Sequence, residues 1–453
     1  MCVSIKMATK FFVKIIAPSK LALIGLQKFE LDLFQPTSKM TDNEFTIEGL
    51  LTLEQVGMVV ENGYKVLVEE VSSKRTRSTK ETVGFDSWIE DTESRQARGM
   101  EAAVHGGYLS ERGVETALQH LARKYKSITE LVTLPERTHE HRISHAVRIA
   151  NGKGTRPGVL FIGGVHAREL INPDLLITFG LNLCQAYTNG TGLNFGPKSY
   201  DSSTIKNIVD SLDVFIFPLV NPDGRAFVQS PTGDGMWRKN RNANSGLSCK
   251  GVDLNRNYEF LWQSGIGTSA SSCTDIFKGS AAFSEPETRN VKHMIDSYNN
   301  IQFMIDVHSY SELVLYPWGD DDYQTEDPTM NFNNPQFDGQ RGSPGDSIYK
   351  EYIPKKDLDW FKDTGMKIKD AISSVRGSSY SVGPGIGLYP TSGTAHDFAF
   401  ALHFVSTGNR KIMAYTVETA KEFQPTYSEA LKVMSEVSAG LLEFCIASES
   451  AGP

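Results

Sequence analysis

Residues Gly158 to Glu169 read Gly-Val-Leu-Phe-Ile-Gly-Gly-Val-His-Ala-Arg-Glu, an unbroken apolar run that ends in a polar cluster. A continuous apolar run of this length is typical of a strand that is buried on both faces of a sheet. Asn172-Pro173 follows, and a proline at the first helical position favours a helix start. The stretch therefore predicts a strand, a loop and a helix of an α/β domain.

Strands and helices alternate in the same way along the rest of the chain from residue 108. Apolar runs at 214–220, 303–307 and 412–417 predict further strands, and helices are expected around 360–375 and 428–445. Ser110 is expected to cap one helix, and Ser284 with Glu287 forms a capping-box pattern before another. We expect an α/β fold with a mixed, mostly parallel sheet covered by helices on both faces.

The first 71 residues form a smaller pattern of their own. Apolar runs at 11–16 and 45–50 predict strands, Thr52 and Gln55 form the capping box of a helix that Gly63 ends, and 64–71 alternates like a strand. Residues 72–107 are polar and show little periodicity, as in a linker. We expect a small α/β module at 1–71, a linker at 72–107, one large domain at 108–446 and a tail at 447–453.

Composition argues against several classes of protein. The chain has 46 Lys and Arg against 54 Asp and Glu, a net charge of −8, whereas nucleic-acid binding requires clustered basic residues. No apolar stretch approaches the ~20 residues of a membrane span. Lysines at 6, 10 and 14 interrupt any secretory signal sequence. Five cysteines without C-x-x-C spacing argue against a disulfide scaffold or a structural zinc site.

Polar side chains collect where the predicted strands end. His166 and Glu169 follow the first apolar run, His308 follows 303–307, and Glu418 follows 412–417. In sheets of this kind, functional groups lie just beyond the carboxyl ends of the strands. A catalytic zinc ion takes three protein ligands, and two His with one Glu is a standard set. This edge of the sheet therefore predicts a zinc site.

Several motifs follow one another in a fixed order along residues 108–445. They are His166-Ala167-Arg168-Glu169, Asn221-Pro222-Asp223-Gly224, Trp237-Arg238-Lys239, Gly251-Val252-Asp253-Leu254-Asn255-Arg256-Asn257, His308-Ser309-Tyr310-Ser311, Tyr389 with Ser392-Gly393 and Asp397, and Glu418. Together they resemble the motifs of the zinc metallocarboxypeptidases of the carboxypeptidase A type. The resemblance implies a carboxypeptidase-like catalytic domain that hydrolyses the C-terminal peptide bond of peptides or proteins through a zinc-activated water.

The resemblance also implies a role for each matched residue. It makes His166, Glu169 and His308 the ligands of one zinc ion. Glu418 would act as general base and acid, and Arg238 would stabilise the developing oxyanion. Asp253 would orient the zinc-bound His166. The remaining matched residues would contact the substrate, and they are Asn255, Arg256, Tyr389 and Arg168.

His396 lies where, by resemblance, the base of the specificity pocket is formed. Aliphatic residues there go with apolar C-terminal side chains, and Asp goes with basic ones, so a histidine fits neither class. A neutral His favours a polar, uncharged pocket, and a charged one could accept an acidic side chain. We hypothesise that basic C-terminal residues are disfavoured.

The resemblance also implies a disulfide between Cys249 and Cys273, which flank the Asp253 motif. A disulfide favours a secreted protein, which conflicts with the missing signal sequence, so the compartment stays open. The N-terminal module resembles propeptide-like modules of secreted relatives. Cleavage within 72–80 would then activate a zymogen, and the alternative is a permanent, uncleaved module.

Two other functions remain open. His396 leaves room for a peptidase of the same superfamily that acts on polyglutamate or cell-wall peptides. A catalytically dead protein that binds chain ends would keep the fold without turnover. As partners we expect peptides or proteins with a free C terminus, no nucleic acid and no membrane, and we expect a monomer.

Overall fold

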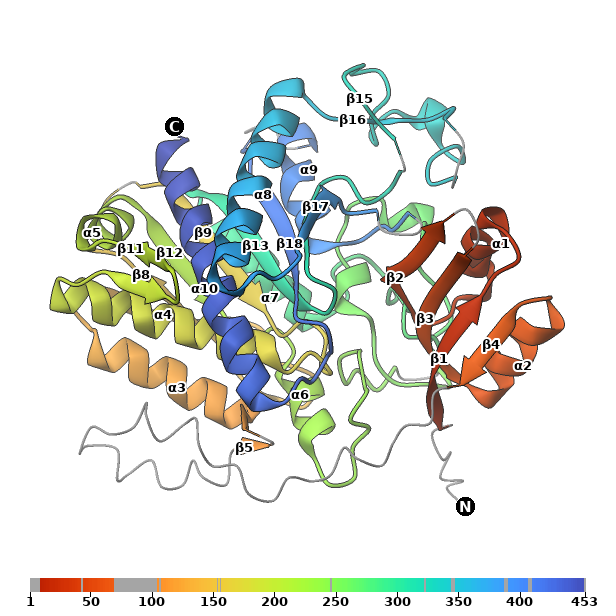
Figure 1. Cartoon of the computed structure of the whole chain (residues 1–453), viewed down its shortest axis with the longest axis horizontal. Coiled ribbons are helices and arrows are strands. Elements are labelled where there is room, and N and C mark those ends of the chain that lie inside the picture. Colours follow the sequence, from red (N-terminus) through yellow and green to blue (C-terminus); the bar gives the residue numbers. More distant parts are fainter. Residues whose placement is uncertain are drawn as a thin grey trace.

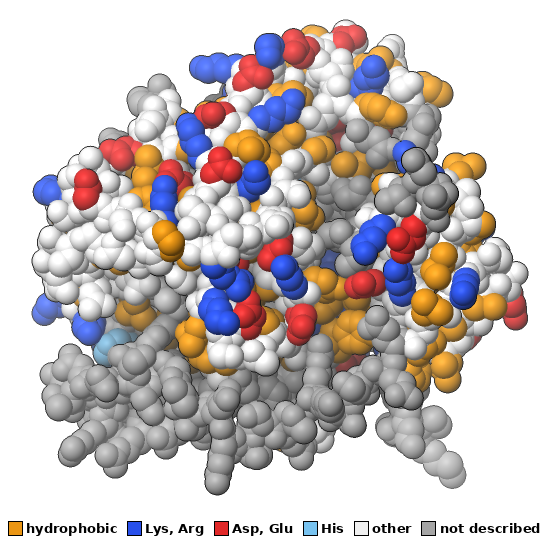
Figure 2. Space-filling model, in the orientation of Figure 1, with side chains coloured by type: hydrophobic (Ala, Val, Ile, Leu, Met, Phe, Trp, Pro, Cys, Tyr) orange, Lys and Arg blue, Asp and Glu red, His pale blue; other side chains and the backbone are white. Residues whose placement is uncertain are grey.

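A computed structural model describes residues 9–41, 44–68, 104–105, 107–152, 154, 156–244, 247–321, 323–343, 347–386, 390–405 and 410–451. Figure 1 shows a large unit of helices around a sheet and a smaller unit, formed by the N-terminal residues, packed beside it. Acidic and basic side chains are interspersed over the face drawn in Figure 2. None of the helices in the described residues combines the length and apolar character needed to cross a membrane.

The large unit is built on an eight-stranded sheet with the order β17-β14-β18-β13-β9-β12-β8-β7. Its strands are β7 (Thr129–Thr133), β8 (His145–Ile149), β9 (Gly158–Gly163), β12 (Asp213–Phe217), β13 (Ile301–Ser309), β14 (Leu313–Tyr316), β17 (Ser381–Pro384) and β18 (Met413–Thr419). The four central strands β18, β13, β9 and β12 are parallel to one another. The outer pairs β7–β8, β8–β12 and β14–β18 are antiparallel. The predicted mixed sheet is confirmed.

Helices cover both faces of this sheet. They are α3 (Glu111–Lys124), α4 (Ile171–Asn189), α5 (Ser202–Ser211), α6 (Pro222–Gln229), α7 (Pro286–Ser297), α8 (Lys355–Arg376), α9 (Ala395–Val405) and α10 (Tyr427–Ser450). Tyr415 of β18 packs against Phe361 of α8 and Phe444 of α10, whereas the next residue, Thr416, contacts His396 of α9. Successive residues of a strand point to opposite faces, so α8 and α10 lie on one face and α9 lies on the other (Figure 1).

The small unit is a four-stranded antiparallel sheet with the order β2-β3-β1-β4. Its elements are β1 (Lys10–Ile16), α1 (Lys20–Ile24), β2 (Leu33–Thr41), β3 (Glu44–Thr52), α2 (Leu53–Glu61) and β4 (Lys65–Val68). Thr52 and Gln55 form the predicted capping box of α2. Val13, Ile15 and Ile47 belong to a hydrophobic core that this unit does not share with the large one. Most of the predicted linker lies outside the described residues.

Short strands pair outside the two sheets. They are β5 (Val104–His105) with β6 (Tyr108–Leu109), β10 (Leu193–Phe195) with β11 (Lys198–Tyr200), and β15 (Gln324–Thr325) with β16 (Glu351–Tyr352). The last helix, α10, runs to Ser450, four residues past the expected end of the large domain.

One expected helix start is wrong. Ser284 does not cap α7, which has Glu285 at its N-cap and Pro286 as its first residue. The Ser284 hydroxyl donates to Glu285, and Glu287 accepts from Asn240 instead of returning to the cap. Tertiary partners therefore replace the local capping box.

Candidate metal centre

Three neighbouring strands bring the predicted ligands and the predicted base Glu418 to one edge of the sheet. On β13 and β18, His308 lies in register with Glu418, and β9 flanks β13 on the other side. After β9 the chain turns at Gly164, whose φ of +63° favours glycine. This turn leads directly to His166 and Glu169, which face His308.

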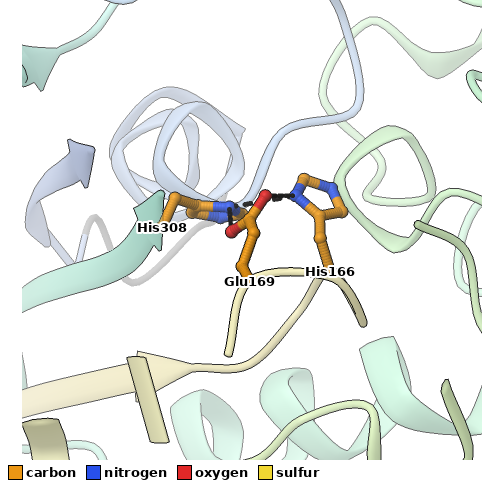
Figure 3. Close-up of side chains that lie close together, drawn as sticks. All are labelled: His166, Glu169 and His308. Atoms are coloured by element: carbon orange, nitrogen blue, oxygen red, sulfur yellow. Dashed lines mark hydrogen bonds and ion pairs between the residues drawn. The ribbon is translucent and has the colours of Figure 1, made fainter. Parts of the chain in front are cut away.

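The side chains of His166, Glu169 and His308 converge; we call them the first cluster (Figure 3). His166 Nδ1 lies 2.7 Å from Glu169 Oε1. His308 Nδ1 lies 3.1 Å from Glu169 Oε2 and also 3.1 Å from His166 Nδ1. All three side chains are buried, with at most 3% of each residue exposed.

The donor set fits a zinc ion. The two ring nitrogens that face each other at 3.1 Å can both present lone pairs when the proton of each neutral imidazole is on its other nitrogen, and a cation can then bind both. Burial acts to lower the pKa of His308, but Asp306 and Glu169 raise it well above its ordinary value, so this pocket favours a positive charge. Imidazole nitrogen and carboxylate oxygen are ligands that zinc prefers.

Each histidine of the first cluster has a carboxylate on its far side. His166 Nε2 lies 3.1 Å from Asp253 Oδ1, and His308 Nε2 lies 2.8 Å from Asp306 Oδ2. Asp253 also accepts from Arg238, which places that arginine beside the cluster. Burial acts to raise the pKa of Asp253, but Arg238 and His166 bring it well below its usual range. The motif pointed to Asp253 but not to Asp306, whose only signal was its place two residues before His308.

Glu418 lies at the end of β18, next to His308. It is half-buried. Burial is the largest cause that raises the pKa of Glu418 above its ordinary value, and the negative charge of Glu169 adds to the effect. A carboxyl group with a raised pKa beside a metal site can both accept and donate a proton near neutral pH.

The expected substrate-contacting residues fall in two places. Asn255 and Arg256 lie in a tight turn at Leu254–Arg256 that Asp253 caps. Asn255 Oδ1 accepts from the backbone of α9, and Arg256 donates to the Gly267 carbonyl. In α9, His396 Nδ1 lies 3.0 Å from Thr416 Oγ1, and its Nε2 lies 3.3 Å from Asp397 Oδ1. Tyr389 lies outside the described residues.

Arg168 pairs with the small unit. Its guanidinium donates two hydrogen bonds, of 2.6 and 2.9 Å, to Asp32. It also lies over the ring of Phe423, 4.3 Å from the centroid. Burial acts to raise the pKa of Asp32, but Arg168 lowers it to about 2, so the pair stays charged in mild acid. No sequence pattern linked these residues, which are 136 positions apart.

Further contacts fix the small unit over this region. Phe34 of β2 packs edge-on against Tyr310 and Phe423, which contact each other as well. At a second point, Lys10 pairs with Asp275, and Ser269 donates to Glu30. Tyr310 follows the ligand strand β13 directly, so the small unit rests on the surface next to the first cluster.

A disulfide joins Cys249 and Cys273 beside the Asp253 turn. Lys239 Nζ donates to the carbonyls of Ser272 and Thr274, at 2.7 and 2.9 Å, and holds the same segment. Cys184 and Cys445 are buried thiols.

His139, Glu285 and Glu287 form a second cluster of similar composition. Here protein donors reach both oxygens of Glu285 and Oε2 of Glu287: Asn240 Nδ2 donates to both glutamates, and Asn242, Ser284 and His139 bond to Glu285. Amide N–H groups directed at the oxygens occupy the positions that a cation would need. We interpret the second cluster as a hydrogen-bond network that supports the fold.

Comparison with known proteins identifies the family of this chain. The family model described as zinc carboxypeptidase matches residues 114–439. Carboxypeptidase A4 of Mus musculus is 27% identical over 353 residues, which cover 74% of this chain and 73% of that protein. The structure of thrombin activatable fibrinolysis inhibitor matches with a TM-score of 0.68 and 21% identity, over 98% of this chain and 99% of the other. Carboxypeptidase A from Helicoverpa armigera matches with a TM-score of 0.69 and 20% identity, over 98% of each chain. The chain therefore belongs to the zinc carboxypeptidase family.

Proposed function

We propose that this protein is a zinc-dependent carboxypeptidase that removes the last residue from peptides or proteins with a free C terminus. The convergence of His166 Nδ1, Glu169 and His308 Nδ1 within 2.7–3.1 Å of one another carries the proposal. These three side chains would hold one zinc ion. When bound, zinc polarises the carbonyl of the scissile bond and makes water a stronger acid.

Glu418 moves the protons of the reaction. It takes a proton from the attacking water as the water oxygen bonds to the carbonyl carbon, and it gives a proton to the amine nitrogen as the carbon–nitrogen bond breaks. The products are a shortened chain with a new carboxylate and a free amino acid. Its raised pKa suits both transfers. Arg238, held by Asp253, stabilises the negative oxygen that forms in between.

Recognition of a chain end requires a cation for the terminal carboxylate. Arg256 has a planar guanidinium suited to a carboxylate, and Asn255 beside it supplies an amide. Tyr389 would cover the bound residue, as the motif order implies. These three residues would make the enzyme act at chain ends and not inside chains.

His396 would contact the C-terminal side chain. Thr416 and Asp397 lie beside its two ring nitrogens, which favours a polar pocket over an aliphatic one. We keep the proposal that Lys and Arg are poor C-terminal residues. A peptide panel that differs only in its last residue tests it, and faster release of Lys or Arg than of Phe, Leu and Glu would contradict it.

The small unit would keep the enzyme inactive until the chain is cut within 72–80. Asp32 pairs with the Arg168 guanidinium. Arg168 is only 1% exposed, so it cannot reach a substrate in the intact chain. The Cys249–Cys273 disulfide supports an extracellular location. We propose a monomer, since catalysis needs no residue from a second copy.

The test of catalysis uses the chain trimmed within 72–107 and N-blocked dipeptides. Glu418→Gln should lower turnover by roughly 10²–10⁴-fold while one zinc stays bound, because only proton transfer is lost. Full turnover in that variant would contradict the mechanism. A zinc-loaded wild-type protein that binds chain ends without cleaving them would favour the dead binding protein, and cleavage of polyglutamate alone would favour the alternative peptidase.

A further inference from the structure

We propose that Asp306 is a positioning residue of the metal centre: it holds the His308 ring with Nδ1 toward the ion and thereby raises the affinity for zinc. The inference rests on the proposed zinc site. It assigns to His308 a carboxylate partner like the one that the motif assigned to His166.

The strand geometry places the two side chains together. Asp306 and His308 lie two residues apart on β13, so both point to the same face of the sheet. His308 Nε2 lies 2.8 Å from Asp306 Oδ2, which is hydrogen-bonding distance for a ring N–H. His308 Nδ1 lies on the opposite side of the ring, 3.1 Å from Glu169.

Asp306 has no other partner that explains its burial. The residue is fully buried, and among the described residues neither of its oxygens accepts a hydrogen bond, although Oδ2 lies 2.8 Å from His308 Nε2 as an ion-pair contact. Asp253, by contrast, accepts from Arg238 and from the Asn255 backbone as well as facing His166. A buried carboxylate with so few partners destabilises a fold. Its position is explained by the ring that it faces.

The chemistry of imidazole gives this contact a consequence. A neutral imidazole carries its proton on one nitrogen only, and the other nitrogen presents a lone pair. An acceptor at Nε2 keeps the proton there and leaves Nδ1 of His308 free to bind an ion. Outer carboxylates of this kind fix the tautomer and the ring orientation and make the ligand more basic.

The experiment measures zinc affinity of the full-length chain by competition with a chromophoric chelator. In Asp306→Asn the side-chain amide can donate to Nε2 and so favours the wrong tautomer. We expect the dissociation constant for zinc to rise by roughly 10–100-fold. The control is Asp174→Asn, which alters a buried aspartate paired with Arg225 and should leave zinc affinity within about twofold. The zinc-induced rise in melting temperature should shrink in the Asp306 variant alone.

The outcomes separate this inference from the proposed function. A wild-type chain that binds no zinc overturns the proposed function. A wild-type chain that binds zinc with an Asp306→Asn variant of equal affinity overturns the role of Asp306. If the variant does not fold, a crystal structure of the zinc-loaded wild type decides: Nδ1 of His308 on the ion with Nε2 hydrogen-bonded to Asp306 is expected, and ligation through Nε2 overturns the inference.

Discussion

The first and second clusters contain the same kinds of side chain at similar spacing, yet they differ in what surrounds them. In both, one ligand atom of each residue lies within 4.8 Å of the others. In the first cluster two ring nitrogens face each other across 3.1 Å. In the second, Asn240 donates to both carboxylates and Asn242 donates to Glu285. In the first, the Asn172 amide and the Ser309 N–H reach Glu169 Oε2, and Oε1 faces His166. Residue types and distances therefore do not define a metal site; the two clusters differ in how many of their ligand atoms are engaged by other donors.

The burial of the two clusters differs as well. The small unit packs beside the first cluster through Phe34 and Asp32, whereas His139 of the second keeps 30% of its side chain exposed. All three residues of the first cluster are buried, whereas the second combines two buried glutamates with an exposed histidine. Four predictions test this contrast.

The largest effect is expected from loss of a ligand in the first cluster. In the trimmed chain, His308→Ala should lose the zinc and lower turnover roughly a thousandfold or more, because the metal contributes several kcal/mol to the transition state. His139→Ala should keep both the zinc and the turnover. Elemental analysis and a dipeptide assay check the pair, and equal losses in the two variants would remove the distinction.

The next effect concerns the small unit over the first cluster. Asp32→Asn in the full-length chain leaves Arg168 buried without its anion, and breaking one side of a buried pair costs about 3–5 kcal/mol. If about 3 kcal/mol of this cost weakens the docking of the small unit, the activity of the uncleaved chain should rise roughly a hundredfold. Glu44→Gln, which alters a surface pair with Lys14, is the control and should not activate the chain. An inactive Asp32 variant that activates normally on cleavage would show that Asp32 is not the inhibitory contact.

A smaller effect is expected from the network of the second cluster. Asn240→Ala removes the donor that Glu285 and Glu287 share, so the free energy of unfolding should fall by about 2 kcal/mol with zinc content unchanged. The control, Asn151→Ala, removes an exposed bond to Asp210 and should stay within about 0.5 kcal/mol. Denaturant titration measures both. Loss of zinc in the Asn240 variant would contradict a purely structural role.

The smallest effect depends on pH. His139→Ala should cost about 1 kcal/mol, because the hydrogen bond to Glu285 is partly exposed. Burial acts to lower the pKa of His139, but Glu285 raises it above its ordinary value of 6.5, so this contribution is complete below pH 6.5 and is lost as the pH rises through the raised pKa. Burial acts to raise the pKa of Glu285, but hydrogen bonds, the largest from His139, lower it below its ordinary value of 4.5. The contribution of Glu285 to stability is therefore lost in acid, as the pH falls through the lowered pKa. The difference between wild type and variant should peak between pH 4.5 and 6.5. A difference in unfolding free energy that does not change with pH would exclude the ion pair. The control is His293→Ala, which alters an exposed histidine.

Much of the site could be predicted because it depends on local pattern. Continuous apolar runs marked the central strands, and His166, Glu169, His308 and Glu418 follow them directly. Parallel strands align their carboxyl ends, so residues far apart in sequence meet at one edge. The Thr52–Gln55 capping box was equally local and was confirmed.

The remaining features depend on contacts that no local pattern carries. The pairing of Asp32 with Arg168 requires the docking of one unit on another, and Asp32 has no motif around it. Asp306 is hidden inside an apolar strand, where only its even spacing from His308 hinted at a shared face. The expected capping box at Ser284 is wrong because Glu287 accepts a hydrogen bond from Asn240, which is distant in sequence.

The most direct test of the central claim is amino-acid release from an N-blocked dipeptide by the trimmed chain, followed through removal and return of the metal. A chelator should abolish release, and one equivalent of zinc per chain should restore it. Release that continues unchanged in the metal-free protein, or no release from the zinc-loaded one, would contradict the assignment of His166, Glu169 and His308 as the ligands of a catalytic zinc.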